Sequence, residues 1–144
     1  TWLIDTLRLP WEAAYHEACR LEHAISAQVE QRMYEALGRP ASCPHGNPIA
    51  DGAPPSAGVP LDTLTVGTAA RVTSIGFPIE FRPEYLGYLE AHGVTPGTLL
   101  RVQEMPPQSD GRAVRIGDET MFLPSAVASA VRVRRTDAPE AAGR

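Results

Sequence analysis

Apolar residues in the first 37 positions recur at steps of three and four, which is the spacing of one helix face. Pro10 suits the first turn of a helix after a short break. Ser26 suits the cap of a second helix that stops at Gly38. Helices of this length cannot bury their apolar face alone, so we expect a partner chain or a missing domain to cover it. The predicted apolar stripe consists of Leu7, Trp11, Ala14, Ala18, Leu21 and Ile25.

The pattern then changes twice along the chain. Residues 38–60 contain six prolines and four glycines, a composition that predicts an extended linker. Beyond it, one helix is predicted at about 83–92, and five strands over about 70 residues suit a small barrel that closes its own edges. The predicted strands, separated mostly by Gly or Pro turns, are 64–75, 99–103, 113–116, 121–123 and 130–133. The expected fold class is α+β, divided into helices 1–38, linker 39–62, barrel 63–136 and tail 137–144.

Composition and charge narrow the function classes. The 144 residues are 43% hydrophobic and carry a net charge of −4, with 13 basic residues that are all arginine. Neither half has the basic excess that binding to phosphates requires, so this stretch alone is expected to bind nucleic acid poorly. Arg132, Arg134 and Arg135 give one local basic edge, which is interpreted as a solvated strand edge. The chain has no apolar run of roughly 20 residues and no signal peptide, so we expect it to be cytoplasmic. Because it does not start with Met, we also expect further residues to precede it.

The densest cluster of metal-binding atoms lies in YHEACRLEH. At about 100° per residue, Cys19, Glu22 and His23 share one helix face with Tyr15 and His16. A thiol, a carboxylate and an imidazole at i, i+3 and i+4 can converge on one borderline ion, such as Fe(II), Mn(II), Co(II), Ni(II) or Zn(II). A surface His and a buried, metal-free Cys are the competing interpretation.

A second pair of donors, Cys43 and His45, lies in CPHGNPI. No further pair follows at zinc spacing, so the run is interpreted as a turn that ends the helical segment. In a chain without a secretion signal we expect Cys19 and Cys43 to be reduced thiols or metal ligands, not a disulfide.

The run WEAAYHEACRLEHAIS, the helix VEQRMYEALG and the turn CPHGNPI resemble the iron- and manganese-dependent repressors of the diphtheria toxin repressor family. The segments LDTLTVGTAARVTSI and YLEAHGVTPGTLLRV are similar to the SH3-like domain of that family and to the FeoA protein. The resemblance implies an N-terminal dimerisation domain and a C-terminal SH3-like barrel. It also implies a primary metal site at Cys19, Glu22 and His23, completed by a residue of a winged-helix domain absent from this chain.

The sequence departs from the family at its ancillary metal site. Tyr15 stands where the family has a His, and His16 is one residue out of register. Glu80 and Glu84 are the nearest candidates for the ligands that the SH3-like domain contributes. The Cys at position 19 favours Fe(II), because members with a carboxylate there tend to sense manganese.

The sequence leaves three functions in competition. The first is the metal-sensing and dimerisation part of a homodimeric, Fe2+- or Mn2+-dependent repressor that controls metal homeostasis and binds a DNA operator through its winged helix. For this reading Zn2+, Co2+, Ni2+ or Cd2+ are possible substitutes in vitro. The second is a metal-free SH3-like adaptor with a helical dimerisation segment. The third and weakest is a zinc-dependent hydrolase with Glu12 or Glu22 as the general base. The sequence has no nucleophile motif and no phosphate-binding loop, so we expect that the protein is not an enzyme.

Overall fold

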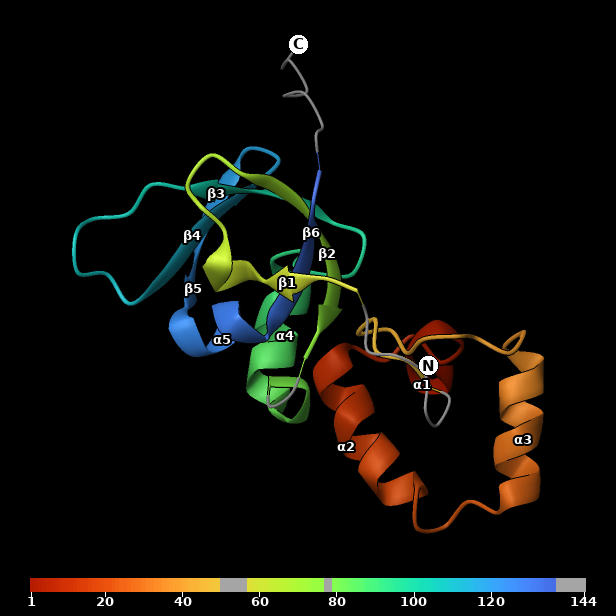
Figure 1. The fold of residues 1–144 in the computed structure, drawn as a ribbon. Coiled ribbons are helices and arrows are strands. Elements are labelled where there is room, and N and C mark those ends of the chain that lie inside the picture. The colour runs from red at the N-terminus through yellow and green to blue at the C-terminus, as the bar shows by residue number, and fades with distance from the viewer. Residues whose placement is uncertain (50–56, 77–78, 137–144) are drawn as a thin grey trace.

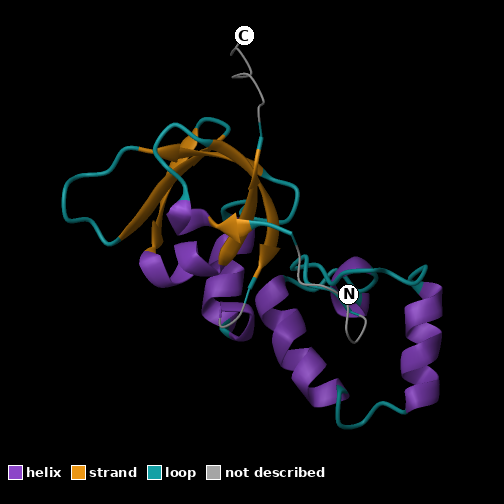
Figure 2. Ribbon diagram, viewed as in Figure 1, coloured by secondary structure: helices purple, strands orange, loops and turns teal. Residues whose placement is uncertain are grey.

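The computed structural model describes residues 1–49, 57–76 and 79–136. A helical segment lies beside a curved antiparallel sheet, as Figures 1 and 2 show. The helices before the sheet are α1 (Trp2–Asp5), α2 (Trp11–Leu21) and α3 (Ala27–Ala36). The predicted fold class, α+β, is confirmed. No helix of the described residues is long and apolar enough to cross a bilayer.

Local sequence signals set the ends of α2 and α3. Pro10 caps α2 in an extended conformation, so the helix starts one residue later than its predicted first-turn proline. The Ser26 hydroxyl accepts a hydrogen bond from the amide of Val29 at 3.3 Å, as predicted for a helix cap. Gly38 follows α3 with a φ of +77°, and its amide donates to the Glu35 carbonyl at 2.9 Å. This left-handed glycine ends the helix, as the sequence predicts.

The second half forms one six-stranded antiparallel sheet in the order β1-β6-β2-β3-β4-β5. Helix α4 (Pro83–Ala91) lies between β2 and β3 in the chain, with the short 3-10 helix η2 (Ile79–Phe81) before it. Five of the strands match the predicted runs. The strands are β1 (Val59–Pro60), β2 (Ala69–Ile75), β3 (Leu99–Gln103), β4 (Gly111–Ile116), β5 (Glu119–Pro124) and β6 (Val131–Arg135).

The sheet does not close its own edges, in contrast to the prediction. Among the described residues β1 and β5 remain the two ends of the strand order. Helix α5 (Ser125–Ala130) and the 3-10 helix η1 (Leu61–Thr63) pack against each other and against β4 across the opening. The sequence analysis missed α5, whose buried Val127, Ala128 and Ala130 complete the barrel core.

The hydrophobic core lies inside the curved sheet, beneath α4 and α5. Alternate strand residues point inward, as a half-buried sheet requires. The largest fully buried side chains are Leu61, Val72, Ile75, Leu86, Leu89, Val94, Leu100, Val102, Val114, Leu123, Val127 and Val131.

Part of the apolar stripe of α2 packs against this chain's own barrel, which corrects the expectation that a partner chain or a missing domain covers all of it. Trp11 is only 5% exposed and belongs to the barrel core cluster, and its backbone amide donates to the Glu90 carboxylate of α4 at 2.7 Å. Gly87 permits this close approach, since a Cβ there would lie 3.0 Å from the Glu12 carboxylate. Leu7 and Leu21, by contrast, are 55% and 40% exposed. Only part of the stripe is therefore available to a partner.

The first part of the predicted linker is also docked on the barrel. Ser42 and Pro48 form an isolated antiparallel bridge, so residues 42–48 make a tight loop. The Asn47 side chain donates to the Ile75 carbonyl at 2.7 Å, and the Ile75 amide donates to the His45 carbonyl at 2.8 Å. The loop therefore joins the helical segment to the end of β2 instead of spanning open solvent. The second part of the predicted linker, residues 50–56, and the predicted tail, 137–144, lie outside the described residues.

Candidate metal centre

The predicted primary ligands lie at the C-terminal end of α2. Cys19 is on its last turn, whereas Glu22 is the C-terminal cap and His23 follows the helix. Cys19 is exposed. The Glu22 carboxylate lies 3.2 Å from Nε2 of His23, and these side chains are 63% and 84% exposed. The end of the helix thus presents a thiol, a carboxylate and an imidazole to solvent within five residues of chain.

The three side chains are not gathered around one point in this structure. Within residues 1–49, 57–76 and 79–136, no group of three or more His, Cys, Asp or Glu side chains is arranged to hold a metal ion. Glu22 and His23 are instead directed toward each other. The chemistry of the donor set nevertheless fits a borderline divalent ion, because all three residues are exposed and supply sulfur, oxygen and nitrogen.

Tyr15 lies one turn before Cys19, and two of the predicted ligands, Cys19 and Glu22, affect the pKa of its phenol. Partial burial raises the pKa of the Tyr15 phenol, and the neighbouring Cys19 and then Glu22 raise this pKa further. Negative charge on the thiol or the carboxylate therefore opposes ionisation of the phenol.

Cys19 and Glu22 line a hollow of about 240 Å³ that the sequence analysis did not foresee. Its other walls come from α1, the 42–48 loop and Phe81, and they include Cys43 and His45. The predicted turn at Cys43 is confirmed, since the Gly46 amide donates to the Cys43 carbonyl at 2.9 Å. Docking of that loop is what brings Cys43 and His45 to the hollow. Cys19 and Cys43 are not joined in a disulfide, as expected.

The candidate ancillary ligands have other neighbours. The segment that precedes α4 lies against α2, but the Tyr15 ring meets the ring of Phe81 there, edge to face at 6.3 Å. Glu84 is held by the Arg82 guanidinium at 2.8 Å, and this hydrogen bond lowers the pKa of the Glu84 carboxyl. The side chain of Glu80 lies outside the described residues. An aromatic contact thus occupies the position at which the family resemblance predicts an ancillary ligand.

Comparison with known proteins identifies both halves of the chain. Residues 1–51 match the family described as "Iron dependent repressor, metal binding and dimerisation domain", and residues 59–135 match the FeoA domain. Residues 59–135, more than half of the chain, belong to the FeoA domain family. The resemblance found in the sequence is therefore confirmed, and the barrel is a FeoA domain.

Two curated relatives and one solved structure illustrate the similarity. The iron-dependent repressor IdeR of Mycobacterium leprae (strain TN) is 33% identical over 147 residues, which are 92% of this chain and 63% of that protein. The diphtheria toxin repressor of Corynebacterium jeikeium (strain K411) is 28% identical over 158 residues, 94% of this chain and 65% of that protein. A manganese-dependent transcriptional repressor in complex with manganese is similar with a TM-score of 0.80 and 30% identity, over 94% of this chain and 65% of that one.

The chain thus spans less than two thirds of the length of each of these three proteins. The similarity includes both the helical segment, in which α2 carries Cys19, and the FeoA domain.

Proposed function

We propose that the chain is the metal-sensing and dimerisation part of a metal-dependent transcriptional repressor that controls metal homeostasis. The observation that carries the proposal is the exposed thiol, carboxylate and imidazole at the end of α2, within a segment that matches a metal binding and dimerisation domain. Relatives named as iron- and manganese-dependent repressors support Fe2+ or Mn2+ as the signal.

In this proposal Cys19, Glu22 and His23 hold the ion. Exposed side chains change rotamer within nanoseconds, so the Glu22–His23 pair can open and all three groups can turn toward a cation. A bound ion supplies positive charge and coordination positions for a ligand from elsewhere in the whole protein. An ion shared between two parts of a protein favours the arrangement in which both reach it, and this differential affinity is the basis of allosteric control.

The proposed homodimer uses the hollow of about 720 Å³ between α2 and α3. Apolar side chains from both helices and the neighbouring loops line it, including Leu3, Leu21, Ile25, Met33, Leu37 and Ile49. Leu21 and Ile49 are 40% and 41% exposed. A two-fold contact is the commonest way for a soluble protein to cover such a surface. In the whole cytoplasmic protein, a winged-helix domain outside this chain would bind the operator.

Cobalt(II) titration followed by visible absorption tests the metal site. A thiolate ligand gives a charge-transfer band, so we expect Cys19→Ser to abolish the band and His23→Gln to weaken cobalt binding at least tenfold. His16→Gln is the matched control, because His16 is an exposed histidine of the same helix. Cys43→Ser controls for the other thiol at the hollow.

The opposite pattern contradicts the proposal. A cobalt band that survives Cys19→Ser would remove Cys19 from the site, and a parent chain that binds neither Co2+ nor Mn2+ would leave the adaptor as the better reading. Sedimentation velocity tests the dimer separately. Leu21→Arg should give a monomer, whereas Leu7→Arg should not, because Leu7 is an exposed leucine that does not line this hollow.

A further inference from the structure

Arginines gather on the outer face of the FeoA-domain sheet, although the chain as a whole is acidic. On β2 the buried Ala70 and Val72 flank the exposed Arg71. On β6 the buried Val131 and Val133 alternate with exposed arginines, Arg132 and Arg134. Because successive strand residues point to opposite faces, these arginines lie on the face turned away from the core.

The neighbouring strands extend this arginine face. Buried Leu100 and Val102 flank Arg101 on β3, and buried Val114 precedes Arg115 on β4. The strands β6, β2, β3 and β4 are consecutive neighbours in the sheet. We call Arg71, Arg101, Arg115, Arg132 and Arg134 the arginine face.

The strand register places like charges directly opposite each other. Arg71 pairs with Arg134 across β2 and β6, and Arg101 pairs with Arg115 across β3 and β4. Such pairs destabilise a sheet, because their side chains start only about 5 Å apart. The Arg71–Arg134 pair, which forms no ion pair with other described residues, is therefore a cost to the fold in the absence of an anion.

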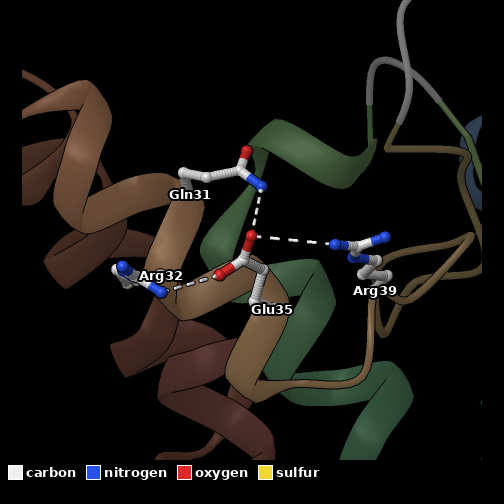
Figure 3. A network of polar contacts seen from close by, with 4 residues as sticks. All are labelled: Gln31, Arg32, Glu35 and Arg39. Atoms are coloured by element: carbon white, nitrogen blue, oxygen red, sulfur yellow. Dashed lines mark hydrogen bonds and ion pairs between the residues drawn. The ribbon is translucent and has the colours of Figure 1, made fainter.

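The arginines within helices α2 and α3, Arg20 and Arg32, form ion pairs with Glu17 and Glu35 of the same helix. Figure 3 shows Arg32 and Arg39 of the α3 region on either side of Glu35, at 3.3 and 3.7 Å. Among the described residues, Arg71, Arg101, Arg132 and Arg134 form no ion pair. Arg71 and Arg101 each donate to a turn carbonyl, of Gly97 and Gly67, which orients the guanidinium without neutralising its charge.

We propose that the arginine face binds the phosphate backbone of duplex DNA. Guanidinium groups bind phosphates through two parallel hydrogen bonds, and this chain uses arginine at every basic position. Positions on adjacent strands are about 4.8 Å apart, so the face is several phosphates wide. The arginine face is defined by the register of the strands. That its ligand is DNA and not an acidic protein rests on the proposed function.

Fluorescence anisotropy with a labelled 20-base-pair duplex lacking any operator tests the proposal. The whole 144-residue chain is used with EDTA present, so that the result does not depend on metal sensing. Four phosphate contacts predict a slope of log K against log salt of about −3.6, or roughly a 150-fold loss of affinity between 50 and 200 mM salt. We expect Arg71→Gln with Arg134→Gln to weaken binding about tenfold or more and to reduce the slope to about −1.8.

Arg32→Gln with Arg39→Gln is the matched control, because it removes the same charge from α3 and the turn after it and should leave both the affinity and the slope unchanged. Circular dichroism and thermal melting verify that the variants are folded; the Arg71 and Arg134 variant should melt no lower than the parent. Two results overturn the proposal: no DNA binding at 20 mM salt, or equal losses in both double variants. Tighter binding of a labelled polyglutamate peptide than of the duplex would also overturn it, in favour of an acidic protein partner. Cobalt binding through Cys19 is measured separately, so either proposal can fail alone.

Discussion

Replacing Trp11 with alanine tests whether the helical segment and the FeoA domain form one cooperative unit. Trp11 is the first residue of α2, yet only 5% of it is exposed, and it packs within the cluster of the barrel core. Burial of about 150–250 Å² at about 25 cal/mol per Å² gives an upper range of about 4–6 kcal/mol. Measured Trp→Ala losses of about 3–5 kcal/mol agree with it. We therefore expect Trp11→Ala to lower the free energy of unfolding by about 4 kcal/mol.

Urea unfolding followed by far-ultraviolet circular dichroism measures this loss, since the free energy of unfolding falls linearly with urea. Leu7→Ala is the control, because Leu7 belongs to the same predicted stripe but is 55% exposed. It should change stability by no more than about 0.5 kcal/mol. A Trp11→Ala loss below about 1 kcal/mol would refute the packing of α2 on the barrel.

Glu90 provides an independent test of the same contact. Its carboxylate accepts a hydrogen bond from the Trp11 amide at 2.7 Å and lies at the positive end of the α2 dipole. Glu90→Ala should therefore cost about 1 kcal/mol. Because the two residues are in contact, the double variant should differ from the sum of the single losses by at least about 0.5 kcal/mol. If the two losses of unfolding free energy were strictly additive, the start of α2 and helix α4 would not be energetically coupled.

Three further substitutions test local features. Gly46→Ala should lower the free energy of unfolding by more than about 2 kcal/mol, because its Cβ would lie 2.2 Å from a β2 carbonyl oxygen. The control is Gly38→Ala, which has a similar φ but open space around it and should cost about 1 kcal/mol. Equal losses in urea unfolding would contradict the docking of the 42–48 loop. Ser26→Ala should remove about 1 kcal/mol and reduce helicity, and an unchanged melt would argue against the cap. Arg82→Gln should raise the pKa of Glu84 in a carboxyl NMR titration. Because the pKa is lowered in the folded protein, the Arg82–Glu84 pair stabilises the fold above the ordinary carboxyl pKa, and this stabilisation is lost as the pH falls through the folded pKa. A Glu84 titration that is unchanged in the variant would exclude the pair.

Elements whose signals are local could be predicted from the sequence. The Ser26 cap and the glycine after α3 depend on neighbouring residues alone, and both are found in the structure. Helix α5 could not be predicted in the same way, because SAVASA has no clear polar period. Its helical state depends on the opening in the sheet that Val127 fills. Strand β1 is likewise made by pairing with β6, from a proline-rich segment that has little strand propensity of its own.

In the candidate site, too, local features could be predicted from the sequence and features that depend on tertiary contacts could not. Helical spacing alone places Cys19, Glu22 and His23 together at one end of α2, because all three are within five residues of chain. The hollow beside them requires residues 42–48 to dock on β2, and no local pattern indicates that docking. The arginine face required knowledge of the strand register: net charge averages over the whole chain, and it concealed five arginines on one face.

The two ends of α2 have different surroundings, and this difference bears on how a metal signal could spread. The first turn is buried, with Trp11 in the core and its amide on Glu90, whereas Cys19 and His23 at the other end are exposed. An 11-residue helix is a rigid rod of about 16 Å, so anchoring its first turn fixes the direction of its last turn relative to the barrel. Ligands on such a helix need only side-chain rotation to reach an ion, and any ligand from another domain must approach from the solvent side. The FeoA domain thus supports the helix whose far end carries the proposed metal ligands.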